Sequence, residues 1–307
     1  MDYDTPVLLI IFNRPDITRQ TLTAIRKVQP KYLFVAADGP RHGHPDDLER
    51  CRAAREVIND VDWDCELKTL FRDQNRGCGY GPAEAITWFF EHVEHGIILE
   101  DDCMPSESFF PYCAELLERY KNDGSIYMIT GTNPLKRWRR REASYHYAFM
   151  GNSLGWASWR RAWQSFDYTI SQWGHPDGQS KLRQKVGSRY FSHFNGQLDE
   201  IYRNQPKDIW DFQWLYARWV HGGRTIVPSK NLVTNIGFNE QATHSLNEND
   251  LLANLPVFEL VPPYVPPARK HDHLFDRMVF ERFINPQPRS FFKKAVMKAA
   301  KIITGTN

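Results

Sequence analysis

Residues 96–102 read Gly-Ile-Ile-Leu-Glu-Asp-Asp, a short apolar run that ends in three adjacent carboxylates. The run Ile97 to Leu99 is typical of a buried strand. Negative charges at the end of a buried strand favour a bound cation. Mg²⁺ and Mn²⁺ prefer carboxylate oxygens and leave coordination positions open for phosphate oxygens. The alternative is a solvated acidic turn that binds nothing.

Strand and helix patterns alternate over the first 100 residues. Apolar runs predict strands at 7–12, 32–37, 67–71 and 97–99, with helices from about 16, at 47–60 and at 83–94. This alternation predicts an α/β fold with a mostly parallel sheet flanked by helices. Ligands of such sheets bind at the carboxyl ends of the strands. Polar residues follow three of the predicted strands there: Asn13 and Arg14, Asp38, and the triplet Glu100, Asp101 and Asp102. Their expected convergence favours a ligand site over a solvated turn.

The stretch Gly77-Cys78-Gly79-Tyr80-Gly81 lies between two predicted elements, in a loop that we expect to end at Pro82. A dinucleotide fingerprint should follow the first strand directly, where this chain has Asn-Arg-Pro instead. A glycine loop before a helix can still place backbone N–H groups near an anion. A plain tight turn explains the glycines equally well.

The rest of the chain divides into two further parts. Patterns predict helices at 109–120, 156–166, 197–202 and 212–220, strands at 125–130 and 224–228, a basic loop at 133–144 and an extended Pro-rich segment at 255–267. We expect one half of a domain at 1–130, the other half of the same domain at 131–250, and a C-terminal extension at 251–307. In the basic loop, the residues Arg137 to Arg141 can either contact an acceptor or form a solvated face.

Composition excludes several classes of protein. The net charge of the 307 residues is only +2, which gives no general attraction to nucleic acid. The five cysteines form no CxxC pair, so zinc-finger and thioredoxin sites are excluded, and a reducing, cytoplasmic compartment is expected. No signal peptide or run of about 20 apolar residues is present.

The C-terminal residues 289–303 predict a basic amphipathic helix. Phe291, Phe292, Val296 and Ile302 fall on one face, and four lysines fall on the other. Such a helix can lie on the anionic inner leaflet of a membrane, or it can dock on protein. The two possibilities are equally compatible with the sequence.

Two polar residues of the second half are further candidates. Asp211 heads an aromatic helix, where it is either an N-cap or a general base in an aromatic-walled pocket. His244 lies in the polar segment 239–245, where a single histidine is more often a surface residue than a ligand.

Several segments, in this order, resemble nucleotide-sugar glycosyltransferases of the GT-A fold: residues 10–15 (IIFNRP), 35–39 (VAADG), 98–102 (ILEDD), 154–156 (LGW) and 209–211 (IWD). The similarity is to N-acetylglucosaminyltransferases that begin N-glycan branching and to family-2-like bacterial glycosyltransferases. It covers residues 6–245 and implies a GT-A type, Rossmann-like fold, with a nucleotide-sugar-binding half at 1–130 and an acceptor-binding half at 131–250. The chain departs from the branching enzymes at Phe212, where they carry a second aspartate.

The resemblance implies a role for each candidate. Asp38 would accept a hydrogen bond from uracil, and Arg14 would contact the diphosphate, with Asn13 and Arg76 in the same nucleotide-binding set. Asp102 would hold Mn²⁺ or Mg²⁺, together with His244. Glu100 and Asp101 would lie near the ribose and the sugar, and Asp211 would be the catalytic base.

We therefore predict a metal-dependent glycosyltransferase that moves a sugar from a nucleotide-diphosphate donor, a UDP-sugar, to a glycan or lipid-linked acceptor. With Asp211 as base, the reaction would invert the anomeric centre. One alternative is a sugar-phosphate nucleotidyltransferase, although the Gly-rich, basic signature usual after its first strand is absent here. A non-enzymatic carbohydrate-binding or membrane-associated protein is the other. The donor sugar, the acceptor and the oligomeric state are left open.

Overall fold

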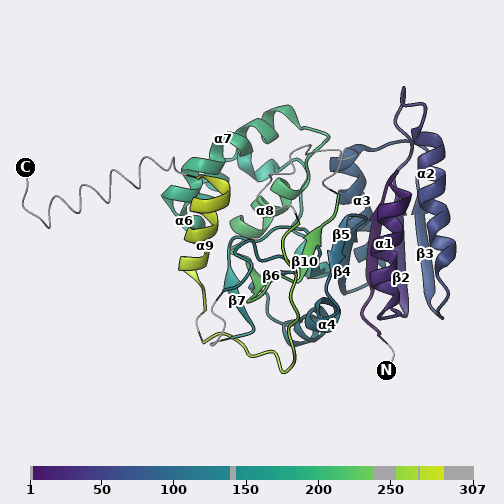
Figure 1. Ribbon diagram of the computed structural model, residues 1–307. Helices are drawn as coiled ribbons and strands as arrows, with labels where there is room; N and C mark the ends of the chain where they lie inside the picture. Colours follow the sequence, from purple (N-terminus) through teal and green to yellow (C-terminus); the bar gives the residue numbers. More distant parts are fainter. Residues whose placement is uncertain (1–2, 139–142, 238–253, 269, 287–307) are drawn as a thin grey trace, which may run out of the picture.

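A mixed sheet with helices on both faces forms the centre of the molecule (Figure 1). The computed structural model describes residues 3–138, 143–237, 254–268 and 270–286. Within these residues the sheet has eight strands in the order β3-β2-β1-β4-β8-β6-β9-β7. They are β1 (Val7–Ile11), β2 (Tyr32–Ala37), β3 (Glu66–Phe71), β4 (His95–Glu100), β6 (Ile126–Thr130), β7 (Tyr145–Ala148), β8 (Trp156–Trp159) and β9 (Arg224–Pro228).

Most neighbouring strands are parallel. The strands β1 to β4 run in one direction, as do β6 and β9, whereas β8 and β7 are antiparallel to their neighbours. A separate two-stranded sheet pairs β5 (Cys103–Pro105) with β10 (Val233–Asn235). β5 directly follows the acidic triplet. The predicted mostly parallel, Rossmann-like sheet between helices is confirmed.

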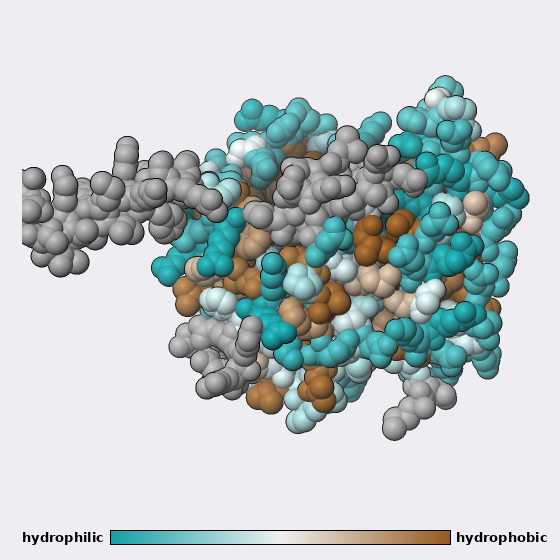
Figure 2. Space-filling model, in the orientation of Figure 1, coloured by the Kyte–Doolittle hydropathy of each residue, from teal (hydrophilic) through white to brown (hydrophobic). Residues whose placement is uncertain are grey.

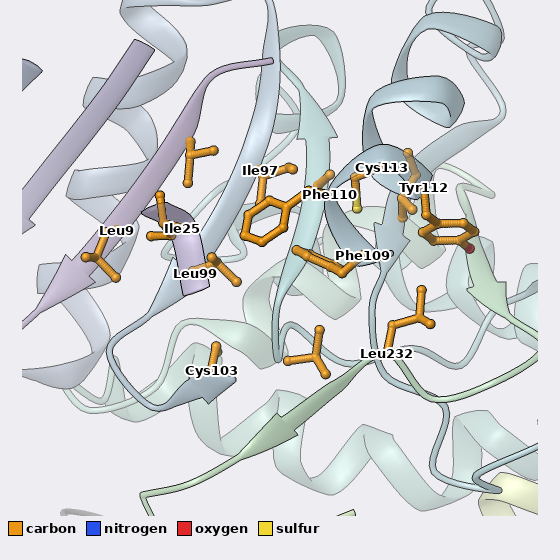
Figure 3. Packing of buried hydrophobic residues seen from close by; sticks show 14 of the residues in the cluster. Leu9, Ile25, Ile97, Leu99, Cys103, Phe109, Phe110, Tyr112, Cys113 and Leu232 are labelled. Atoms are coloured by element: carbon orange, nitrogen blue, oxygen red, sulfur yellow. The ribbon is translucent and has the colours of Figure 1, made fainter. Parts of the chain in front are cut away.

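Alternate residues of each central strand enter different halves of the core, because successive side chains point to opposite faces. Leu9 and Leu99 pack with Ile25, Phe109 and Phe110 on one face (Figure 3). That face is covered by α1 (Pro15–Arg26), α2 (Asp47–Glu56), η1 (Val57–Asp60) and α4 (Phe109–Arg119). The other face is covered by α3 (Gly77–His92), α5 (Arg160–Trp163) and α8 (Asp211–Val220). Burial on both faces explains why the strands are apolar throughout.

A third cluster extends the molecule beyond β7 and β9. It joins α8 to η2 (Ser171–Gly174), α6 (Pro176–Val186), α7 (Ser188–Asn204), α9 (His273–Val279) and η3 (Phe280–Ile284). These helices gather at the end of the sheet opposite β3 (Figure 1). At the β3 end, hydrophilic side chains cover α1 and α2 (Figure 2).

Two predicted elements differ from the structure. The glycines predicted to form a loop lie inside α3, which begins at Gly77. The helix predicted at 156–166 is instead strand β8 followed by the single turn α5. All four residues of β8 are buried, because the strand lies between β4 and β6, and buried runs of this length have no diagnostic period.

Other predicted segments are confirmed, or fall outside the residues that the structure describes. Residues 255–268 form no helix or strand, as expected for the Pro-rich segment, and the helix predicted at 197–202 belongs to the longer α7. The C-terminal helix predicted at 289–303 and His244 lie outside the described residues. In the described part of the chain, no helix is long and apolar enough to cross a membrane.

The basic loop is anchored at its start. The indole Nε1 of Trp138 donates to Asp272 Oδ2 at 2.9 Å, and the guanidinium of Arg137 lies 3.8 Å from the centre of the Phe258 ring. Both side chains therefore stabilise the fold here, whereas the sequence also allowed them a role in binding an acceptor.

Candidate functional site

Three strand ends meet at one cavity of about 330 Å³. Arg14 follows β1, Asp38 follows β2, and the acidic triplet Glu100, Asp101 and Asp102 ends β4 and follows it. All of these residues line the cavity, together with Asn235 at the end of β10 and Gly237 just after it. The structure therefore brings together the polar residues that the sequence placed at the carboxyl ends of neighbouring strands.

The three acidic side chains differ in their contacts. Asp101 is buried, with 3% of its surface exposed, and its carboxylate pairs with the guanidinium of Arg14. Asp102 accepts from Arg14 Nη2 at 3.1 Å through Oδ2, and 16% of its side chain stays exposed. Asp101 therefore holds Arg14 in place, whereas Asp102 keeps an exposed carboxylate at the cavity.

Of the three acidic residues, Glu100 has the most strongly raised pKa. Burial, and then the negative charges of Asp102 and Asp101, raise its pKa to about 8. Burial also raises the pKa of Asp101, to about 6, because it outweighs the opposing effect of the Arg14 charge. One guanidinium thus faces three carboxylates in a cavity wall, an excess of negative charge that a divalent cation would relieve.

The residues present fit a cation that takes its remaining ligands from a substrate. Among the described residues, no group of three or more His, Cys, Asp or Glu side chains forms a complete metal site. Mg²⁺ is commonly bound through one or two carboxylates plus phosphate oxygens and water, which Asp102 and Glu100 could provide. Gly237 leaves the necessary space, because a Cβ there would lie 2.6 Å from Asp102 Oδ2 and 2.7 Å from Arg14 Nη1.

Asp38 connects the end of β2 to the start of α3. Its carboxylate accepts from the backbone N–H groups of Gly39 at 2.9 Å, Arg76 at 2.9 Å and Gly77 at 3.1 Å. Burial raises its pKa in spite of these hydrogen bonds. The Arg76 N–H lies 2.9 Å from each carboxylate oxygen, so three N–H groups cover all of the roughly four acceptor positions of Asp38, and an N–H group of a ligand would have to replace one half of this shared hydrogen bond.

Two predicted nucleotide-binding side chains point elsewhere. The Asn13 amide donates to Asp47 Oδ1 at 2.8 Å, and Asn13 is not part of the cavity lining. The guanidinium of Arg76 donates to Glu84 Oε1 at 2.7 Å, so only its backbone N–H reaches Asp38.

Two arginines of the cavity were missed by sequence reasoning. Arg41 lies three residues after Asp38, and Arg72 directly follows β3. Their position after strand ends was the available signal, since it is the same one that identified Arg14 and Asp38. Asp47 holds Arg41, and Glu84 holds Arg72 at 3.0 Å.

Asp211 lies in a second cavity, of about 360 Å³, rather than in the first. It is the first residue of α8, whose N-cap is Trp210, so the predicted capping position was one residue off. Its Oδ1 accepts from the backbone N–H of Phe212 at 3.0 Å. Asp211 is close enough to the triplet for its charge to contribute to the raised pKa of Glu100.

Comparisons with known proteins give structural matches only. No protein-family model matches this chain. No curated protein matches it either. An inositol-1-phosphate CTP transferase from T. maritima is 11% identical, covering 76% of this chain and 90% of that one, with a TM-score of 0.36. A 4-diphosphocytidyl-2C-methyl-D-erythritol synthase from Anaerococcus prevotii is 7% identical over 80% and 95%, with a TM-score of 0.35. HddC from Yersinia pseudotuberculosis is 8% identical over 51% and 77%, with a TM-score of 0.31.

These matches correct the main functional prediction. The inositol-1-phosphate enzyme is named a CTP transferase and none of the three is named a glycosyltransferase, so the predicted transfer of a sugar from a UDP-sugar to a glycan or lipid-linked acceptor is contradicted. The finding agrees better with the alternative drawn from the sequence, a sugar-phosphate nucleotidyltransferase.

Proposed function

We propose that this protein is a divalent-cation-dependent nucleotidyltransferase that joins a nucleoside monophosphate, taken from a nucleoside triphosphate, to a phosphorylated acceptor. One observation carries the proposal. A single cavity contains a carboxylate suited to a base, an acidic triplet suited to a cation, and three arginines suited to phosphates. A triphosphate with its metal ion has this combination of charges.

The charged side chains of the cavity suit the different parts of a nucleotide. Asp38 would accept an N–H group from the base, which uracil and cytosine both offer. Arg14, Arg41 and Arg72 would donate to phosphate oxygens, and the planar guanidinium groups match such oxygens in pairs. Asp47 and Glu84 hold two of these arginines in position before a substrate arrives.

The proposed reaction is a displacement at phosphorus. An oxygen of the acceptor phosphate attacks the α-phosphorus, the bond from that phosphorus to the bridging oxygen breaks, and pyrophosphate leaves. Arg14 would position the phosphates from its place against Asp101, and Asp38 would fix the base. A divalent ion held by Asp102 and Glu100 would stabilise the negative charge on the departing pyrophosphate. With a sugar phosphate as acceptor, the product would be a nucleotide sugar.

Release of pyrophosphate tests this proposal. The full chain would be incubated with Mg²⁺ or Mn²⁺, with CTP, UTP, ATP or GTP, and with a panel of hexose 1-phosphates and polyol phosphates. We expect pyrophosphate release that requires the metal, the triphosphate and an acceptor, and that chelation abolishes. No release with any combination would overturn the proposal.

Three variants sharpen the test. Asp102→Asn keeps the shape of the side chain and removes its charge, and we expect it to lower the rate at least 100-fold. Gly237→Ala places a methyl group against Asp102 and Arg14, so it should also lower metal-dependent turnover while the far-UV circular dichroism stays that of the wild type. Asp62→Asn is the matched control, because Asp62 is exposed and pairs with Arg26 away from the cavity. Equal losses in all three variants would contradict the assignment.

A further inference from the structure

The second cavity contains a buried arginine with no acidic partner. Arg218, on α8, has only 2% of its surface exposed. Its Nη1 donates to Thr225 Oγ1, and its Nη2 donates to the Gly151 carbonyl at 3.1 Å. Both acceptors are uncharged, and no carboxylate of the described residues lies within ion-pair distance of Arg218. Burial lowers its pKa to about 9. A buried charge without a counterion is unfavourable unless a bound anion neutralises it.

Two buried donors of the same cavity lack an acceptor. Arg218 Nε and Trp214 Nε1 are both buried and have no hydrogen-bond partner among the described residues. Both residues line the cavity. Each of these nitrogens can only donate, so the missing partner must be a hydrogen-bond acceptor. The cationic arginine and the indole N–H together suit the oxygens of a carboxylate or phosphate.

The remaining walls suit a sugar ring. Aromatic side chains line much of the cavity, among them Phe194, Phe212 and Phe283. Asn152 and Gln197 add polar groups that can bind hydroxyls. Apolar and aromatic walls with a few polar groups are the usual construction of small-molecule sites, and aromatic faces pack well on sugar rings.

We propose that this second cavity binds the acceptor of the reaction, and that the acceptor is an acidic sugar with an anionic group in addition to its reacting phosphate. The anionic oxygens lie at Arg218 and Trp214, and the ring lies against the aromatic wall. The reacting phosphate points toward Asp211, the lining residue whose charge reaches the acidic triplet. The assignment as acceptor rests on the proposed function, whereas the anion site does not.

Binding of simple probes tests the anion site directly. Glucuronate, inorganic phosphate and uncharged glucose would each be titrated into the full chain, with binding followed by calorimetry and by tryptophan fluorescence. We expect glucuronate to bind at least tenfold more tightly than glucose, and phosphate to compete with it. Equal binding of glucuronate and glucose, or no binding of either anion, would overturn the proposal.

Variants then locate the bound anion. Arg218→Met should weaken glucuronate binding at least tenfold and leave metal-dependent nucleotide binding unchanged. Arg189→Met is the matched control, since Arg189 pairs with Glu281 on the surface of α7. If Arg218→Met fails to fold, Trp214→Phe keeps the ring, removes only the N–H donor and should weaken binding about fivefold. Wild-type affinity in the folded variants would place the anion elsewhere and sink the proposal.

The two proposals fail separately. Loss of glucuronate binding in Arg218→Met without any pyrophosphate release would support the anion site and remove nucleotidyl transfer. Pyrophosphate release with an unchanged KM for the acceptor in Arg218→Met would support the reaction and remove the acceptor site.

Discussion

Asp47 shows how a single residue supports the candidate site without facing it. It is 3% exposed and accepts hydrogen bonds from Arg41 Nε at 2.6 Å, from Arg41 Nη2 at 2.9 Å and from the amide of Asn13 at 2.8 Å. Asn13 follows β1 and Arg41 follows β2, so one carboxylate connects two of the loops that form the cavity. The adjacent Arg41 guanidinium holds the pKa of Asp47 well below its usual range.

This depressed pKa predicts a pH dependence of stability. A carboxyl whose pKa is lower in the folded than in the unfolded state stabilises the protein above its unfolded pKa, about 4, and loses that contribution as the pH falls toward the folded value. We expect Asp47→Asn to lower the free energy of unfolding by about 2 kcal/mol at pH 7 and by progressively less below pH 4. Urea unfolding between pH 3 and 7 measures this. A difference that does not change with pH would contradict the assignment.

At the scale of elements, the start of α3 determines the shape of the first cavity. The N–H groups of Arg76 and Gly77 are bound by Asp38, which lies at the end of a different element. Gly79, in the first turn of the helix, donates its backbone N–H to the Lys207 carbonyl at 3.1 Å. The glycines therefore allow α3 to approach both β2 and the loop before α8, rather than forming a phosphate-binding loop.

Substitution of Gly79 tests this close approach. A Cβ at Gly79 would lie 2.5 Å from the Lys207 carbonyl oxygen and 2.7 Å from Ile209 N, which are backbone atoms that cannot rotate away. We expect Gly79→Ala to cost about 1–3 kcal/mol of stability. Gly196, within α7, has open space around its Cβ position, so Gly196→Ala should stabilise by roughly 0.5–1 kcal/mol. Thermal unfolding of both variants measures the difference, and equal effects would refute the packing argument.

At the scale of the whole molecule, one sheet joins parts of the chain that the sequence assigned to different halves. β4, from the first half, pairs with β8 from the second, and β6 pairs with both β8 and β9. Hydrogen bonds and core contacts therefore cross the predicted boundary at residue 130. A functional division at this boundary stays a prediction.

The continuity of the sheet predicts the behaviour of a fragment. A chain of residues 1–130 would retain β4 but lose β8, exposing an apolar edge at Ile97 and Ile98, and β6 would lack both of its partners. Unpaired apolar edges favour aggregation. We expect this fragment to aggregate or to unfold without a cooperative transition, as measured by light scattering and circular dichroism. A sharp, reversible transition would show that the first half folds independently.

The amino-acid sequence alone was enough to predict the alternation of strands and helices, the parallel sheet and the meeting of Arg14, Asp38 and the acidic triplet at strand ends. These follow from local apolar runs and from the geometry of parallel sheets. The folded chain was needed to see that Asn13 and Arg76 turn away from the cavity, that Asp211 belongs to a second cavity, and that Arg218 is buried there with no counterion among the described residues. The physical reason is that a side chain's partners, such as Asp47, Glu84 or Thr225, come from distant segments that only the folded chain brings together.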